Sequence, residues 1–143
     1  MDIEKAFAIS ASGLNAQKRR LEVISSNLAN VESTRTAEGG PYRRKDVIFA
    51  TTPVAAALEG PTEFAAIYQG VKISKIVLDK TPLKKVFEPQ HPDADVDGYV
   101  LYPNVNGVSE MVNMLSALRS YDANVTALDA SKSMALKALE IGR

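Results

Sequence analysis

The chain has 143 residues, with seventeen basic and seventeen acidic side chains, and is 45% hydrophobic but only 6% aromatic. This balanced charge argues against nucleic-acid and anionic-membrane binding, which need a positive surplus on one face, and the absence of cysteine excludes disulfides and thiol chemistry. No apolar run approaches the ~18 residues of a membrane span, and the first residues lack the pattern of a cleavable secretory signal.

Residues 3–31 are predicted to form a long amphipathic helix. Apolar residues recur there at steps of three and four, which is the spacing of one helix face, and Ser10 and Gln17 interrupt the stripe. We expect this face to be an interface. Its apolar members are Phe7, Leu14, Leu21, Ile24, Leu28 and Val31.

A turn-rich linker at 32–41 leads into a predicted small β-rich module. Its strands are recognised by β-branched and aromatic residues bounded by glycine and proline. The predicted strands cover residues 42–52, 70–78, 83–87 and 99–102. Residues 53–70, which mix alanine with proline and glycine, are expected to form a loop.

Residues 107–141 contain no proline and no interior glycine, and are predicted to form a second helix of roughly 50 Å. Such a helix is longer than a compact domain of this size needs, so its apolar seam requires a partner along its length. Lys132 is the one charged position on that seam. The large residues of the seam, expected at an interface, are Met114, Leu118, Tyr121, Val125, Leu128 and Leu139.

The two stripes allow two arrangements. The helices can bury each other within one chain as an antiparallel pair, or the stripes can meet other subunits. Alanine-rich faces and polar interruptions favour assembly, because two helices alone make a thin core and polar groups on a seam need partners. In either case we predict an α+β fold with a coiled-coil-like pair of terminal helices, divided into segments 1–36, 37–103 and 104–143.

Asparagine is a poor helix former, yet it recurs inside both predicted helices. Asn27 and Asn30 flank the first seam, Asn124 flanks the second, and Asn113 lies near the start of the second helix. These residues fit exposed polar positions as well as they fit hydrogen bonds that set the register between packed helices. The sequence leaves both interpretations open.

Three candidate chemical sites are weak. The segment 93–98 matches the first half of a calcium loop, but Asn104 replaces the closing glutamate, so an acidic turn is favoured. The single histidine, His91, has no carboxylate and nucleophile at a recognisable spacing. The basic run at 43–45 is expected to be a solvated strand end, because it lacks an aromatic platform. The sequence therefore predicts no enzyme, no metal and no cofactor.

Several motifs, in order along nearly the whole chain, resemble one family. Residues 12–16 (SGLNA), 20–21 and 26–30 (SNLAN) are similar to the N-terminal signature of bacterial flagellar rod, hook and related axial proteins. Further motifs resemble the proximal-rod branch of that family, at residues 41–49, 91–95, 98–100, 103–105, 110–114, 119–125 and 132–134. The signature positions are Asn27, Asn30, Asn113, Arg119 and Asn124.

The resemblance implies a non-enzymatic subunit of the proximal rod that polymerises through its terminal helices into a tubular driveshaft. This shaft would transmit motor torque across the periplasm and enclose the export channel. The implied partners are the chain itself, the sibling rod proteins FlgB, FlgF and FlgG, the adaptor FliE and the membrane ring, with no nucleic acid or small-molecule substrate. Export would use the flagellar type III apparatus without a cleaved signal peptide. An alternative from another class is a helical adaptor or export chaperone that binds a partner helix with the same stripes.

Overall fold

The computed structural model of the chain describes residues 3–54 and 68–141. The elements in chain order are α1 (Ile3–Ala29), β1 (Lys45–Pro53), β2 (Gln69–Leu78), β3 (Lys84–Phe87), β4 (Tyr99–Tyr102) and α2 (Gly107–Ile141). A small β-rich region thus lies between two long terminal helices in the sequence, and the predicted α+β fold is confirmed. Residues 55–67 of the predicted loop lie outside the described residues.

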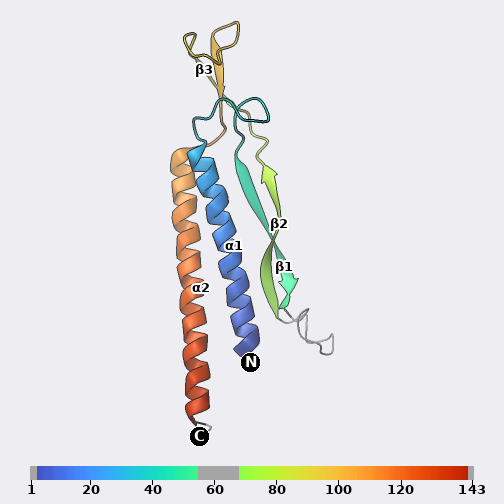
Figure 1. Cartoon of the computed structure of the whole chain (residues 1–143), viewed down its shortest axis with the longest axis vertical. Helices are drawn as coiled ribbons and strands as arrows, with labels where there is room; N and C mark the ends of the chain where they lie inside the picture. Colours follow the sequence, from blue (N-terminus) through green and yellow to red (C-terminus); the bar gives the residue numbers. More distant parts are fainter. Residues whose placement is uncertain (1–2, 55–67, 142–143) are drawn as a thin grey trace.

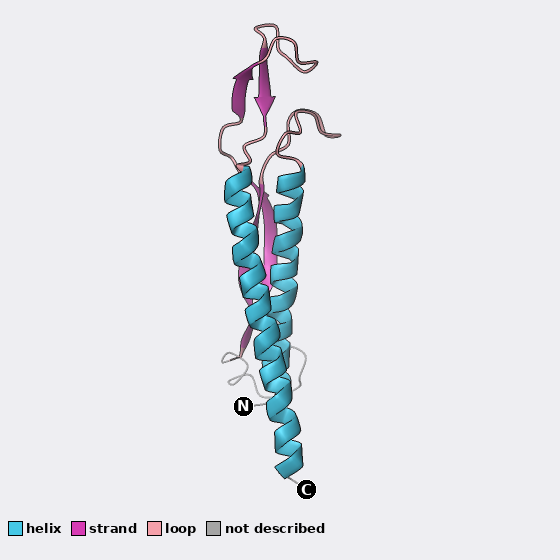
Figure 2. Cartoon of the chain, turned by 90° about the vertical axis from the view of Figure 1, so that its left-hand side faces the viewer, coloured by secondary structure: helices cyan, strands magenta, loops and turns pink. Residues whose placement is uncertain are grey.

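The described part of the molecule is elongated, and its layers are ordered α2, α1, hairpin (Figures 1 and 2). α1 and α2 run antiparallel along the long axis, and the β1–β2 hairpin packs along α1. The β3–β4 hairpin projects beyond the end of the pair at which α1 ends and α2 begins. α1 is therefore the central layer. No helix in residues 3–54 and 68–141 is long and apolar enough to cross a membrane.

The four strands form two separate antiparallel hairpins, a pairing that the sequence did not predict. The β1–β2 hairpin has a register shift between Ile48 and Phe49, and both side chains are exposed. In the loop before β4, Gly98 has a φ of 79°, and a Cβ there would lie 2.9 Å from the Phe87 ring. Because an isolated two-stranded hairpin is marginally stable, each hairpin depends on its contacts with the rest of the chain.

Small residues let the two helices approach closely. Ala16 of α1 and Ala117 of α2 are buried. A Cβ added to Gly13 would lie 3.0 Å from the side-chain amide of Asn124. The interhelical distance depends on the side chains at the contact, so the helices can approach this closely at Gly13 because a larger side chain is absent there.

Candidate functional site: the polar junction and the apolar stripe of the helix pair

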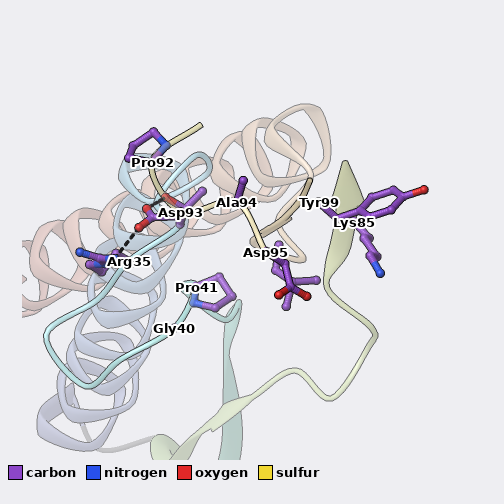
Figure 3. Close-up of a pocket in the computed structure, with 11 residues that line it drawn as sticks. Arg35, Gly40, Pro41, Lys85, Pro92, Asp93, Ala94, Asp95 and Tyr99 are labelled. Atoms are coloured by element: carbon purple, nitrogen blue, oxygen red, sulfur yellow. Dashed lines mark hydrogen bonds and ion pairs between the residues drawn. The ribbon is translucent and has the colours of Figure 1, made fainter. Parts of the chain in front are cut away.

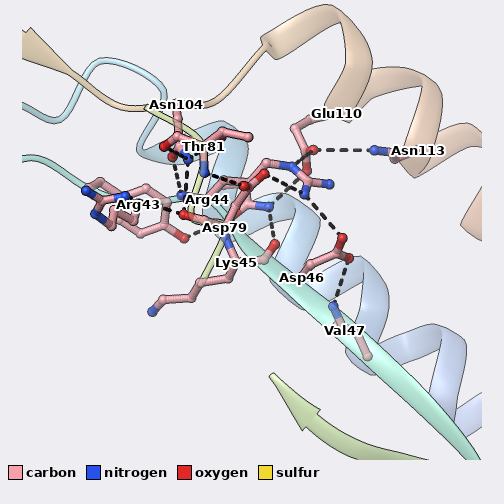
Figure 4. A network of polar contacts seen from close by, with 12 residues as sticks. Arg43, Arg44, Lys45, Asp46, Val47, Asp79, Thr81, Asn104, Glu110 and Asn113 are labelled. Atoms are coloured by element: carbon pink, nitrogen blue, oxygen red, sulfur yellow. Dashed lines mark hydrogen bonds and ion pairs between the residues drawn. The ribbon is translucent and has the colours of Figure 1, made fainter. Parts of the chain in front are cut away.

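A buried polar junction joins the end of α1, the start of β1 and the start of α2. We define it as Asn27, Tyr42, Arg44, Asn104 and Glu110 (Figure 4 shows its Arg44, Asn104 and Glu110). Its members come from segments far apart in the sequence, so the junction fixes how those segments sit relative to one another.

Asn27 is the centre of the polar junction and is only 1% exposed. Its Nδ2 atom donates to the Lys45 carbonyl at 2.8 Å and to Glu110 Oε2 at 3.0 Å. Its Oδ1 atom accepts from the Lys45 amide at 2.9 Å and from the Tyr42 hydroxyl at 3.0 Å. An asparagine amide has two donors and two acceptor lone pairs, and all four are used here. Asn27 therefore makes a hydrogen bond between α1 and α2, as the register-setting interpretation of the sequence requires.

Arg44 supplies the countercharge for Glu110, which is 1% exposed. Its Nε atom lies 2.8 Å from Glu110 Oε1, and its Nη1 atom lies 3.2 Å from Asp46. Partial burial acts to lower the pKa of Arg44, but the hydrogen bonds and charges of Glu110 and Asp46 outweigh it and raise this pKa. A buried carboxylate without such a partner would be strongly unfavourable.

The prediction that the basic run at 43–45 is solvated is correct for Arg43, which is exposed. It is wrong for Arg44, which is held in the polar junction. The reason is that the countercharge lies on α2, 66 residues further along the chain. No local pattern could have identified Glu110 as that partner.

Asn104 ties the turn after β2 to the polar junction. Its Oδ1 atom accepts from the Arg44 amide at 2.8 Å, and its Nδ2 atom donates to the Thr81 hydroxyl at 2.8 Å. In the same turn the Thr81 amide and hydroxyl hold the pKa of Asp79 below its ordinary value, and the charge of Arg44 acts in the same direction. The turn, the strand start and the first turn of α2 are thus linked.

The other asparagines of the family signature have local roles. Asn113 donates to Glu110 Oε1 at 3.4 Å and so borders the polar junction. Asn30 and Asn124 donate to carbonyls four residues earlier in the chain, at 2.8 and 3.0 Å. For Asn30 and Asn124 the register-setting interpretation is therefore not supported by a hydrogen bond to the other helix.

The most deeply buried residues of α2 are not members of the predicted apolar seam. They are Glu110, Ala117 and Ser131, and the half-buried Asn124 completes a strict heptad. These residues are small or polar. The close approach of the helices at Gly13 suits such residues. Four of the six large residues of the predicted seam are half-buried, whereas Leu118 and Leu139 are exposed.

The large aliphatic residues at the start of α2 face solvent instead. We call this surface the apolar stripe, and each of its residues is at least 41% exposed. It consists of Val108, Met111, Val112, Leu115 and Leu118. A contiguous exposed apolar surface on a soluble domain marks an interaction site, and here it follows one side of a helix.

The residues predicted at an interface are distributed over both the covered and the open sides of the pair. Ile24 is buried, and Leu118 and Leu139 are exposed, as is the signature residue Arg119. The half-buried ones are Phe7, Leu14, Leu21, Leu28, Val31, Met114, Tyr121, Val125 and Leu128. Their expected role between subunits remains a prediction.

The acidic turn at 93–97 is used for internal contacts. Asp93 pairs with Arg35 at 2.7 Å and accepts from the Thr34 hydroxyl at 2.8 Å, beside an open hollow of about 500 Å³ (Figure 3). His91 Nδ1 accepts from the Asp93 amide at 3.1 Å. In the described ranges, no group of three or more acidic or histidine side chains could hold a metal ion.

Comparison with known proteins matches both helices. A family model described as "Flagella basal body rod protein" matches residues 7–35, and one described as "Flagellar basal body rod FlgEFG protein C-terminal" matches residues 96–141. A Borreliella burgdorferi protein is 45% identical over 99% of this chain and 98% of its own length. A protein of Escherichia coli O6:H1 is 44% identical over 100% of both chains. A protein of Bacillus subtilis (strain 168) is 44% identical over 94% of this chain and 95% of its own length. All three are named flagellar basal-body rod protein FlgC.

Proposed function

Because the chain belongs to the FlgC family of flagellar basal-body rod proteins, it is a structural subunit of that rod, and we propose that it polymerises through α1 and α2 into a tubular shaft. In this proposal the shaft transmits motor torque and encloses the export channel. The chain performs no catalysis; its contribution is mechanical.

The observation that supports this proposal is the apolar stripe of α2. Burying a leucine, valine or methionine side chain is worth about 1.5–3 kcal/mol relative to leaving it in water. The stripe holds five such residues along one side of the helix, while the residues of α2 that are buried within the chain are small or polar. The chain thus folds on one side of α2 and keeps the other side for neighbours.

A shaft built from such helices would resist twisting. Protein interiors are close-packed and transmit strain, so shearing one subunit past the next would disrupt a long seam along its whole length. α2 alone spans 35 residues, or about 52 Å. We place the helical segments 1–36 and 104–143 on the inner side of the tube and the β-rich segment 37–103 outside, since both hairpins leave α2 uncovered.

We further propose the location and partners that the family resemblance implies. The chain is a component of the flagellar basal body, and its place in this proposal is the periplasmic rod, reached by type III export without a cleaved signal peptide. The proposed neighbours are further copies, the rod proteins FlgB, FlgF and FlgG, the adaptor FliE and the membrane ring. No nucleic acid or small-molecule substrate takes part.

A deletion strain tests this function. We expect loss of swimming, with basal bodies that lack the rod, and recovery of both when the intact gene is returned. Normal motility in the deletion strain would overturn the assignment. The adaptor or chaperone alternative makes a different prediction: a stable stoichiometric complex with one partner, and absence of the chain from purified basal bodies.

A further inference from the structure

The turn that connects β3 to β4, residues 88–98, is bonded to the linker at 32–41 through one side chain. Asp93 pairs with Arg35 at 2.7 Å and accepts from the Thr34 hydroxyl at 2.8 Å. In the described parts of the chain, every side-chain hydrogen bond and ion pair between this turn and the linker involves Asp93. The open hollow of about 500 Å³ lies beside the contact, so the turn has room to move away when the contact is lost (Figure 3).

The position of Asp93 depends in turn on His91, the one histidine of the chain. The Nδ1 atom of His91 accepts a hydrogen bond of 3.1 Å from the Asp93 amide. A neutral imidazole has one donor and one acceptor nitrogen, so Nδ1 carries no hydrogen here and Nε2 carries it. His91 therefore supports this geometry of the turn only in its neutral form.

A second proton changes the hydrogen bonding of the ring. Histidine gains this proton at about pH 6.5 when it is unperturbed, and both of its nitrogens are then donors. The Nδ1–H group would face the Asp93 N–H group, and two donors cannot share a hydrogen bond. Glu88 of the same turn offers a new acceptor. Its carboxylate accepts from the Tyr102 hydroxyl at 2.9 Å, and the Tyr102 ring lies edge-to-face with His91, with 6.2 Å between the ring centroids.

The charges around His91 and Tyr102 come from the turn and from the linker, and they are mostly negative. The hydrogen bond to Glu88 raises the pKa of Tyr102 above its ordinary value, and the charge of Glu32 acts in the same direction. Asp93 is a third carboxylate, and Arg35, which pairs with it, is the opposing positive charge. These surroundings tolerate a positively charged ring.

We propose that His91 is a pH switch for the β3–β4 hairpin: when Nδ1 gains a proton from solvent, the turn opens and Asp93 separates from Arg35 and Thr34. The Arg35 side chain is 76% exposed, and exposed ion pairs contribute little to stability, so a small change is enough to release the contact. Loss of one neutral hydrogen bond shifts the ratio of released to bound hairpins by about fivefold.

This inference goes beyond the proposed function and does not depend on it. The hairpin projects beyond the end of the helix pair, so its release changes the surface presented at that end (Figure 1). The polar junction contains no histidine, so the same proton leaves the packing of α1 on α2 unchanged.

Distances between two spin labels on the purified full chain test the switch. The labels are attached at Val96→Cys in the turn, where Val96 is fully exposed, and at Ser116→Cys, an exposed position of α2. The natural sequence has no cysteine, so no other site is labelled. The pH is lowered from about 7.5 to about 5.5, a range in which histidine titrates while unperturbed carboxylates keep their charge. We expect one narrow distance distribution at the higher pH, and at least a threefold larger population of other distances at the lower pH.

Two variants separate the hydrogen bond from the proton. His91→Asn keeps an acceptor near the position of Nδ1 but does not titrate, so its distribution should stay narrow at both pH values. His91→Ala removes the acceptor and should give the broad distribution at both. Circular dichroism verifies that each variant is folded.

Three results would overturn the proposal. The natural chain could show no change of distance with pH. His91→Asn could show the same change as the natural chain, which would assign the effect to another group. His91→Ala could keep the narrow distribution at both pH values, which would show that the bond to the Asp93 amide does not hold the hairpin. None of these results bears on the rod function.

Discussion

Asn27 and Glu110, 83 residues apart in the sequence, share a hydrogen bond of 3.0 Å in a region where both side chains are 1% exposed. This bond joins the last turns of α1 to the first turn of α2. Because Asn27 also holds both backbone groups of Lys45, the same side chain fixes the start of the β1–β2 hairpin. One buried amide thus aligns three segments of the chain.

Replacing Asn27 with alanine should destabilise the protein by about 2–3 kcal/mol, because buried polar partners around it would be left without hydrogen bonds. The free energy of unfolding from urea titration measures this loss. Asn15→Ala is the matched control, since Asn15 is an exposed asparagine of the same helix, and it should change stability by less than about 0.5 kcal/mol. Equal effects of the two substitutions would contradict the role of the polar junction.

Leu115→Lys should leave folding intact and remove motility. Leu115 is exposed in the apolar stripe, and leucine and lysine have similar helix propensities, so the unfolding free energy should stay within about 0.5 kcal/mol. A charge on the stripe would prevent its burial between subunits. Swimming in soft agar is the readout.

Ser116→Lys controls for the new charge, because Ser116 is exposed on α2 outside the apolar stripe. It should swim normally. If Leu115→Lys swims as well as Ser116→Lys, the stripe is not an assembly surface.

Gly70→Ala should weaken the packing of the β1–β2 hairpin on α1. A Cβ at Gly70 would lie 2.6 Å from the Ser12 hydroxyl oxygen, which accepts a hydrogen bond of 3.0 Å from the Val71 amide. Overpacking of this kind costs about 1–3 kcal/mol. The thermal stability of Gly70→Ala is compared with that of Gly107→Ala. A Cβ at Gly107 meets nothing within 4 Å, so the stability of this control should be nearly unchanged. Adding Ser12→Ala should recover part of the loss, since the nearest atom is removed.

Asp79 should make stability depend on pH in the acidic range. The Thr81 amide and hydroxyl, helped by Arg44, hold the pKa of Asp79 below its ordinary value of 3.8. Protonation therefore favours the unfolded chain, so this contribution is fully present above about pH 4 and is lost as the pH falls through the lower folded-state pKa. Between pH 7 and pH 2.5, Asp79→Asn should lose less unfolding free energy than the natural chain. If Asp79→Asn and the natural chain lose the same unfolding free energy between these pH values, Asp79 is not the source of the pH dependence.

Hydrogen exchange should divide α2 into two parts in a dilute monomer. The amides of residues 110–124 lie beside α1 and the polar junction and should exchange slowly. Those of residues 136–141, which we call the tail, extend past the described part of α1 and should exchange fast. Assembly should protect the tail by at least tenfold. Slow exchange of the tail in the monomer would show that it is already covered.

Much of the fold could be predicted from local patterns. Helix α2 and strand β4 have their predicted bounds, because a long uninterrupted helical period and flanking glycine or proline mark them clearly. Helix α1 ends two residues earlier than expected, at Ala29. The pairing of the strands into two hairpins could not be predicted in the same way, since it joins residues that are distant in the sequence.

The most deeply buried residues of α2 could not be predicted from hydrophobic periodicity. The pattern assumes that apolar residues turn inward, whereas here Glu110 is buried and Leu115 is exposed. Glu110 is tolerated inside only because Arg44 and Asn27 reach it from distant segments. A helix whose apolar residues are to be covered by neighbouring subunits buries those residues only in the assembly.

The β3–β4 hairpin lies at one end of the helix pair, and the tail of α2 lies at the other. The molecule therefore has a direction. In any assembly whose subunits all point the same way, the two terminal surfaces are chemically different, one formed by hairpins and the other by helix ends. A component that recognises one of these surfaces has no equivalent site at the other, so the addition of the next component can be confined to a single end.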